Sequence, residues 1–131
     1  MCGILGIKST ISIVDNQRIK IMRDTMSYRG PDSHGLWFDD EEKIGLAHLR
    51  LSILDPTPAG QQPREEAAHN CVISYNGEVY NYLEIRTELE KKGFIFETQS
   101  DTEVVLKSYL EYGVDCLQHF NGMFAIAIWD S

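Results

Sequence analysis

Paired cysteines, basic charge and long apolar runs are all scarce in this 131-residue chain. Its three cysteines, Cys2, Cys71 and Cys116, form no C-x-x-C pair, and its four histidines show no metal-binding spacing, so neither a disulfide framework nor a metal site is indicated. The 12 Lys and Arg residues face 20 Asp and Glu, and the net charge of −8 argues against nucleic acid or an anionic membrane as partner. No apolar stretch approaches the roughly 20 residues that span a bilayer, and no signal peptide is recognisable. These absences favour a protein of the reducing cytoplasm.

The order of the apolar patterns predicts an α+β fold. Strands are expected at 2–7, 35–39, 43–51, 70–80, 94–99 and 122–130, and the Asn76-Gly77 pair is typical of a hairpin turn. Helices are expected at 15–28 behind an Asp15 N-cap, at 81–93, and at 100–113, where Ser-x-x-Glu is a capping box. Such an order favours antiparallel sheets with helices packed on them. The last run is apolar on both faces, which favours an interior strand and a domain that continues past Ser131.

Cys2, directly behind the start methionine, has two interpretations. Cysteine is commonly a small buried residue, and at the start of a strand that interpretation suffices. However, a free thiol has a pKa of about 8.5 and needs a base to act as a nucleophile near neutral pH. Removal of Met1 would make Cys2 the N-terminus, and its own α-amine would then be a general base on the same residue.

Three further positions carry a structural and a functional interpretation each. Asn76-Gly77 suits a type I′ turn, but the Asn76 amide and the Gly77 N–H could also form an oxyanion hole. Arg50 could be a surface residue of a strand, or it could bind a carboxylate through two hydrogen bonds. Asp101 suits the start of a helix, or it could bind an α-ammonium group. His34, His48 and Cys71 have no catalytic partner pattern and are interpreted as structural residues.

Seven ordered motifs together resemble a known family. The motifs are MCGILGI, SYRGPDSHG, LAHLRLSILD, GQQP, SYNGEVYN, SDTEVVL and FNGMFAIAIWD. In this order and spacing the chain resembles class II glutamine amidotransferase domains, and most of all the glutaminase half of asparagine synthetases. RGPD and NGEVYNY favour that branch over the sugar-phosphate and purine-pathway branches. The resemblance covers essentially all 131 residues.

The resemblance implies an N-terminal-nucleophile hydrolase fold, a four-layer αββα sandwich in which two antiparallel sheets lie between helical layers. It also implies that Cys2 is the nucleophile and that Asn76 and Gly77 form the oxyanion hole. Substrate-binding roles are implied for the following residues: Arg50, Leu51, Ser52, Ile53, Leu54, Asn76, Gly77, Glu78 and Asp101. The implied reaction releases ammonia from L-glutamine through a Cys2 thioester.

In full-length relatives the ammonia passes to a synthetase domain that uses ATP and magnesium, so we expect no cofactor in this chain itself. Residues 1–131 are then expected to be a glutaminase domain that is incomplete at its C-terminus, with a C-terminal or separate synthetase domain as partner. A homodimer is compatible with the resemblance. Two alternatives stay open: a glutamine-binding or regulatory fragment without turnover, and the glutaminase domain of an enzyme that acts on a sugar or cell-surface precursor. If Met1 is retained, we expect a poor glutaminase.

Overall fold

The structure is a computed structural model that describes residues 2–12, 14–39, 41, 43–52 and 58–131. Its β-strands and α-helices follow one another as β1 (Gly3–Lys8), α1 (Asn16–Asp24), β2 (Ser33–Asp39), β3 (Ile44–Arg50), β4 (Arg64–Glu66), β5 (Cys71–Val79), α2 (Tyr82–Lys91), α3 (Asp101–Tyr112) and β6 (Gly122–Asp130). Short 3₁₀ turns lie at Ser27–Arg29, Pro58–Gly60, Ala67–His69 and Gly113–His119.

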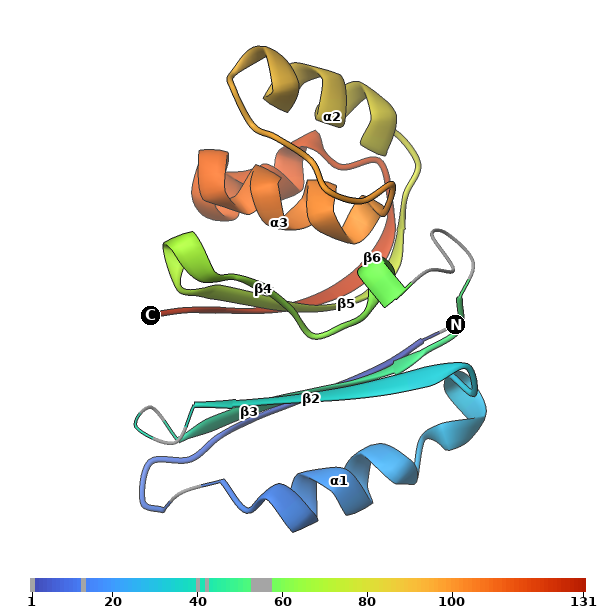
Figure 1. The fold of residues 1–131 in the computed structure, drawn as a ribbon, viewed down its shortest axis with the longest axis vertical. Coiled ribbons are helices and arrows are strands. Elements are labelled where there is room, and N and C mark those ends of the chain that lie inside the picture. The colour runs from blue at the N-terminus through green and yellow to red at the C-terminus, as the bar shows by residue number, and fades with distance from the viewer. Residues whose placement is uncertain (1, 13, 40, 42, 53–57) are drawn as a thin grey trace.

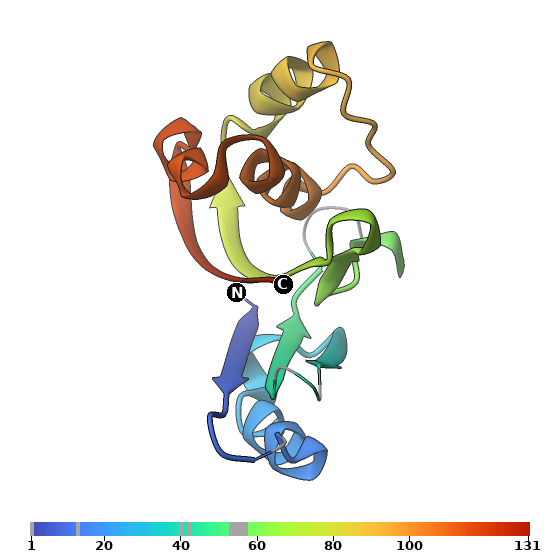
Figure 2. The same ribbon diagram turned by 90° about the vertical axis from the view of Figure 1, so that its left-hand side faces the viewer.

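The described elements form four layers. One antiparallel sheet has the order β1-β3-β2, and the other has the order β4-β5-β6. Figure 1 shows the two sheets face to face, with α1 on the outer side of the first and with α2 and α3 on the outer side of the second. Figure 2 shows the same layering from the side. This arrangement confirms the expected αββα sandwich.

The central strand of the first sheet explains why the sandwich holds together. Every residue of β3 is buried, because β3 has a strand on each side, α1 on one face and the second sheet on the other. Two polar bridges join the sheets across that second face. The hydroxyl of Ser74 donates to the carbonyl of Ala47 at 3.1 Å, and Nε2 of His48 lies 3.0 Å from the carbonyl of Tyr75. These bonds satisfy buried polar groups and align β3 with β5.

The second core lies between β5 and its two helices. Apolar side chains on β5, α2 and α3 are fully buried there, among them Ile73, Leu89, Val105 and Leu106. Their burial fixes the start of α3 beside the second half of β5. The carboxylate of Asp15 accepts hydrogen bonds from the first turn of α1, which confirms the predicted N-cap.

The predicted hairpin at Asn76-Gly77 is wrong. Residues 71–79 form one continuous strand, in which Asn76 pairs with Ala125 and Gly77 pairs with Phe124 of β6. A Cβ atom on Gly77 would lie 2.4 Å from the carbonyl oxygen of Met123, so the glycine serves close strand approach rather than a turn. Pairing with a strand almost fifty residues away overrides the local turn preference.

The predicted strand at 94–99 and the capping box at 100–103 are also corrected. The backbone N–H groups of Glu97 and Thr98 donate to the carboxylate of Glu103 at 3.0 and 2.7 Å, so this segment joins no sheet among the described residues. Ser100 caps α3, since its side chain accepts from the N–H of Thr102 at 3.1 Å. Glu103 does not complete the capping box, because its carboxylate accepts from the N–H groups of Glu97 and Thr98. The backbone N–H of Ser100 instead donates to the hydroxyl of Thr98.

Strand β6 is confirmed in position but not in burial. Its residues are half-buried or exposed, and Met123 is 74% exposed, because β6 has only β5 as a partner among the described residues.

Candidate active site

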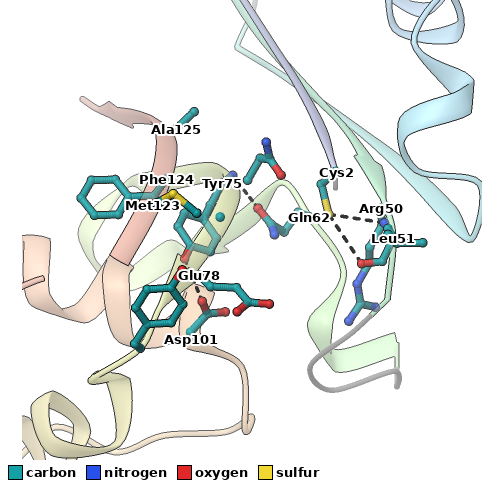
Figure 3. Close-up of a pocket in the computed structure, with 13 residues that line it drawn as sticks. Cys2, Arg50, Leu51, Gln62, Tyr75, Glu78, Asp101, Met123, Phe124 and Ala125 are labelled. Carbon is teal, nitrogen blue, oxygen red and sulfur yellow. Dashed lines mark hydrogen bonds between the residues drawn. The ribbon is translucent and has the colours of Figure 1, made fainter. Parts of the chain in front are cut away.

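A pocket of about 400 Å³ opens where the start of β1, the end of β3 and the second half of β5 meet. Its lining comes from both sheets, from the loop before β4 and from the start of α3, and consists of Cys2, Arg50, Leu51, Gln62, Tyr75, Asn76, Gly77, Glu78, Tyr80, Asp101, Met123, Phe124 and Ala125. In Figure 3, Cys2, Arg50 and Leu51 form one wall, and Tyr75, Glu78 and Asp101 form the opposite wall. The pocket therefore faces a thiol and a guanidinium on one side and two carboxylates on the other.

Cys2 is held at the first wall by the backbone that follows β3. The N–H of Leu51 donates to Sγ of Cys2 at 3.3 Å, and the carbonyl of Leu51 lies 3.6 Å from the same sulfur. The guanidinium of Arg29 donates to the carbonyl of Cys2 at 3.0 Å. These contacts with Leu51 and Arg29 fix both the side chain and the backbone of Cys2 at this wall.

Arg50 contributes a buried cation to this wall. It is the last residue of β3 and only 6% exposed, and its backbone carbonyl accepts from the N–H of Asp32 at 3.0 Å. The register of the sheet supports this position. Because Gly3 pairs with Leu49 and the strands are antiparallel, Cys2 lies alongside Arg50. A buried guanidinium beside an open pocket is suited to bind a carboxylate through two hydrogen bonds.

The opposite wall exists because β4 is short. Among the described residues, β4 pairs only with residues 71–73 of β5, so from Tyr75 onward no described strand lies beside the same edge of β5. Backbone N–H groups of alternate residues point to the same edge of a strand. The N–H of Tyr75 there donates to Oε1 of Gln62 at 2.7 Å, and the N–H of Val79 donates to Oδ2 of Asp101 at 3.3 Å. Gly77 lies between these two residues, so its N–H is directed to this edge, which borders the pocket.

Asp101 is buried against this edge. It is 5% exposed, and its Oδ2 also accepts from the hydroxyl of Tyr75 at 2.7 Å. Burial raises the pKa of Asp101 above its usual value, although the hydrogen bonds from Tyr75 and Val79 act in the opposite direction, and the nearby charge of Glu78 adds to the increase. The same environment raises the pKa of the Tyr75 hydroxyl, chiefly through burial and then through the Asp101 charge. A cationic group in the pocket would favour the ionised form of Asp101.

Most of the predicted site residues meet in this pocket. Seven of them line it: Cys2, Arg50, Leu51, Asn76, Gly77, Glu78 and Asp101. Ser52 does not line it, and its N–H donates to the carboxylate of Asp32 at 2.7 Å. Ile53 and Leu54 lie outside the described residues.

Six lining residues were not predicted, namely Gln62, Tyr75, Tyr80, Met123, Phe124 and Ala125. Gln62 and Tyr75 lie within the motifs GQQP and SYNGEVYN, so a closer reading of these motifs could have singled them out. Phe124 and Ala125 line the pocket because they pair with Gly77 and Asn76 in the sheet. The predicted hairpin turn at Asn76-Gly77 would not allow this strand pairing.

The other two thiols differ from Cys2 in their surroundings. Cys71 and Cys116 are buried, and Cys2 is partly exposed. Burial raises the pKa of Cys71 to about 11, with added effect from the Asp130 charge, and burial also raises the pKa of Cys116. Of the three cysteines, Cys2 is therefore the one suited to act as a nucleophile.

The described part of the chain contains neither a cluster of metal ligands nor a membrane-spanning helix. No three or more His, Cys, Asp or Glu side chains there gather where a metal ion could bind. Among the same residues, no helix has the length and apolarity to cross a bilayer.

Comparisons with known proteins identify the family of the chain. Residues 1–131 match a family model described as a glutamine amidotransferase domain. Asparagine synthetase [glutamine-hydrolyzing] 3 of Bacillus subtilis is 42% identical over 99% of this chain, and a putative asparagine synthetase [glutamine-hydrolyzing] 2 of Methanocaldococcus jannaschii is 40% identical over 99%. The amidase chry2 of Gibberella zeae is 37% identical over 87% of this chain.

The chain spans 21%, 28% and 17% of the length of these three relatives, respectively. Among solved structures, the glutamine phosphoribosylpyrophosphate amidotransferase of Bacillus subtilis superposes with a TM-score of 0.56 at 25% identity, covering 67% of this chain and 21% of that one. The match over the whole chain and the identity to these relatives lead to one conclusion: the chain belongs to the glutamine amidotransferase domain family.

Proposed function

We propose that this chain hydrolyses L-glutamine to glutamate and ammonia, with Cys2 as the nucleophile. The observation that carries the proposal is the convergence of Cys2, Arg50, Gly77 and Asp101 on one pocket from segments up to a hundred residues apart. Family membership and the names of the glutamine-hydrolyzing relatives support it.

In the proposed complex, the two walls bind the two charged ends of the amino acid. Arg50 binds the α-carboxylate through its guanidinium, while Asp101, assisted by Glu78, binds the α-ammonium group. The side-chain amide of the substrate then reaches Cys2. Leu51 holds the thiol by its N–H and contributes pocket surface beside it.

The chemistry needs Cys2 at the N-terminus, so Met1 must first be removed. The α-amine of Cys2 takes the thiol proton as sulfur attacks the amide carbon, and the resulting oxyanion is bound by the side-chain amide of Asn76 and the N–H of Gly77. The C–N bond breaks, the leaving nitrogen takes the proton back, and ammonia departs. Water then hydrolyses the thioester to glutamate, and the α-amine again carries the transferred proton.

We further propose that the ammonia is used by a synthetase domain, either in the same protein beyond this chain or on a separate subunit. ATP and magnesium would act there. The asparagine synthetase relatives favour aspartate as acceptor, whereas the amidase relative carries a different name over a similar stretch. A cytoplasmic location agrees with three free cysteines.

The proposal is tested by measuring glutamate and ammonia released from L-glutamine by the chain after Met1 removal. Cys2→Ala should abolish the release, whereas Cys116→Ala, which removes a buried thiol outside the pocket, should retain it. Persistent hydrolysis by the Cys2→Ala protein would overturn the proposal. Glutamine binding without any turnover by the processed parent would favour the alternative of a binding or regulatory fragment.

A further inference from the structure

The carboxylate of Asp101 is held from β5 by Tyr75. The two side chains are 26 positions apart in the chain, and both are at least 95% buried. The Tyr75 hydroxyl donates to Oδ2 at 2.7 Å, and the Val79 N–H reaches the same oxygen at 3.3 Å. In Figure 3 the dashed bond from Tyr75 ends on Asp101 at the wall opposite Cys2. One carboxylate oxygen is thus occupied by protein donors, which fixes how the group faces the pocket.

Gln62 makes a second bridge parallel to the first. Its Oε1 accepts from the N–H of Tyr75 at 2.7 Å, and its Nε2 donates to the hydroxyl of Thr102 at 3.2 Å. Gln62 is itself 5% exposed. The backbone and the side chain of Tyr75 are therefore both tied to the first two residues of α3, so a shift of Tyr75 would move Asp101 as well.

The charges around Asp101 give this bridge an electrostatic role. The titratable and charged groups around the pocket are Tyr75, Glu78 and Tyr80 in and after β5, Arg50 at the end of β3, and Cys2 before β1. Burial, and to a smaller extent the Glu78 charge, disfavour a negative charge on Asp101, whereas the hydrogen bond from the Tyr75 hydroxyl favours it. Glu103, on the same helix, is bound to the 97–98 segment instead.

We propose that Tyr75 is a positioning residue, which with Gln62 holds Asp101 in the orientation that receives the α-ammonium group of the substrate. The pocket then selects free α-amino acids over amides that lack the amino group. This inference rests on the proposed glutamine hydrolysis and adds the residue that sets its selectivity.

Tyr75→Phe, which removes one oxygen atom, is the test. The readouts are kcat and KM for L-glutamine and for 4-carbamoylbutanoate, which is glutamine without its α-amino group. We expect kcat/KM for glutamine to fall by about 10-fold or more through KM, since a hydrogen bond to a charged group is lost, while kcat/KM for 4-carbamoylbutanoate changes by less than about 2-fold. The ratio of the two specificity constants should therefore fall by about tenfold.

The pH profile separates positioning from general damage to the fold. Loss of the hydroxyl removes a donor to the Asp101 anion, so its pKa rises, and the acid limb of kcat/KM for glutamine should move to higher pH. The acid limb for 4-carbamoylbutanoate should not move with it. Asp101→Asn should lower the same ratio, and adding Tyr75→Phe to that variant should lower it no further.

Tyr109→Phe is the matched control, because the Tyr109 hydroxyl donates to Asp130 at 3.0 Å and neither residue lines the pocket. It should leave both constants unchanged. If Tyr75→Phe does not fold, Gln62→Ala tests the second bridge and should lower the same ratio by a smaller factor. The inference is overturned if Tyr75→Phe lowers kcat/KM equally for both substrates, or if the acid limb for glutamine does not move. It is also overturned if the effects of Tyr75→Phe and Asp101→Asn on the ratio are additive. Failure of the parent to hydrolyse glutamine would instead overturn the proposed function, and the inference with it.

Discussion

The imidazole of His48 on β3 donates from Nε2 to the backbone carbonyl of Tyr75 on β5, at 3.0 Å, and so joins the two sheets beside the pocket. A carbonyl only accepts, so Nε2 carries the proton and Nδ1 is the unprotonated nitrogen. Nδ1 is buried and has no hydrogen-bond partner among the residues that the structure describes. Burial lowers the pKa of His48 to about 4, with Arg50 also lowering it and the Tyr75 carbonyl opposing the decrease. His48 therefore stays neutral in the folded protein across the physiological range.

This relationship predicts an acid-sensitive stability. Below pH 6.5 the unfolded chain protonates His48, whereas the folded chain does so only near pH 4, so the free energy of unfolding falls as the pH is lowered through this window. The His48 contribution to that fall is about 3 kcal/mol. Denaturant unfolding of the parent and of His48→Gln, measured from pH 7 to pH 4, checks it. His48→Gln should be less stable at pH 7 but show a flatter profile, and identical profiles would contradict the account.

The buried carboxylate of Glu103 leads us to expect a second loss of stability, at lower pH than that caused by His48. Burial alone would raise its pKa, but hydrogen bonds from Thr98, from the N–H of Glu97 and from Lys107 outweigh burial and lower the pKa to about 2. A carboxylate with a lowered pKa stabilises the fold above its unfolded value of 4.5 and loses that contribution as the pH falls toward 2.

Glu103→Gln should therefore destabilise the fold by about 3–5 kcal/mol at pH 7, since it leaves the side chains of Arg64 and Lys107 without their buried counter-charge. Glu97→Gln is the matched control. Glu97 also pairs with Arg64, at 3.1 Å, but its side chain is 78% exposed, so its loss should cost less than about 1 kcal/mol. Similar losses in the two variants, measured by denaturant unfolding, would show that burial of Glu103 does not matter.

Local patterns predicted the elements well where local chemistry decides them. Asp15 caps α1 as expected, and the strand ending at Arg50 was expected within a residue of its observed end. The candidate site was predicted largely through a resemblance, and seven of its residues indeed share one pocket. Each of them taken alone had an adequate structural interpretation, because the pocket exists only once both sheets are assembled.

Two wrong predictions and one missed residue share a physical cause. Asn76-Gly77 has strong turn chemistry, but nine consecutive pairs between β5 and β6 stabilise an extended backbone there. The 94–99 segment alternates like a strand, but the Glu103 carboxylate takes its N–H groups. Gln62 escaped prediction because its partner Thr102 is 40 residues away. In every case a long-range partner or a side chain replaced the local one.

Gly77→Ala should remove activity. The new Cβ would lie 2.4 Å from the carbonyl oxygen of Met123 and 2.5 Å from Cα of Phe124, so β5 must shift and carry its N–H away from the pocket. If Gly77 is the proposed oxyanion donor, its loss lowers kcat by about 100-fold or more. Gly6→Ala is the control, since among the described residues its Cβ would meet only the flexible end of Leu46, at 3.2 Å. If Gly77→Ala hydrolyses glutamine at the parent rate, Gly77 has no role in the reaction.

Arg50→Lys should keep the charge and lose the paired hydrogen bonds proposed to bind the α-carboxylate. We expect KM for glutamine to rise by about 10-fold with a smaller change in kcat, because both the bound substrate and the transition state lose the same contact. Steady-state ammonia release measures both constants. Arg18→Lys, at a side chain that is 83% exposed on α1, serves as the comparison and should match the parent. An unchanged KM in Arg50→Lys would remove Arg50 from the proposed substrate site.

The central claim is that the thiol and the α-amine of Cys2 act together at a chain terminus. It is tested most directly by one alanine inserted between Met1 and Cys2, so that processing leaves the thiol in the chain but places its amine in a peptide bond. Intact mass establishes that Met1 has been removed from both proteins, and ammonia release from L-glutamine is then compared. The account predicts release by the parent and a loss of about 100-fold or more in the inserted chain, since its general base is missing. Equal rates in the two proteins would contradict it.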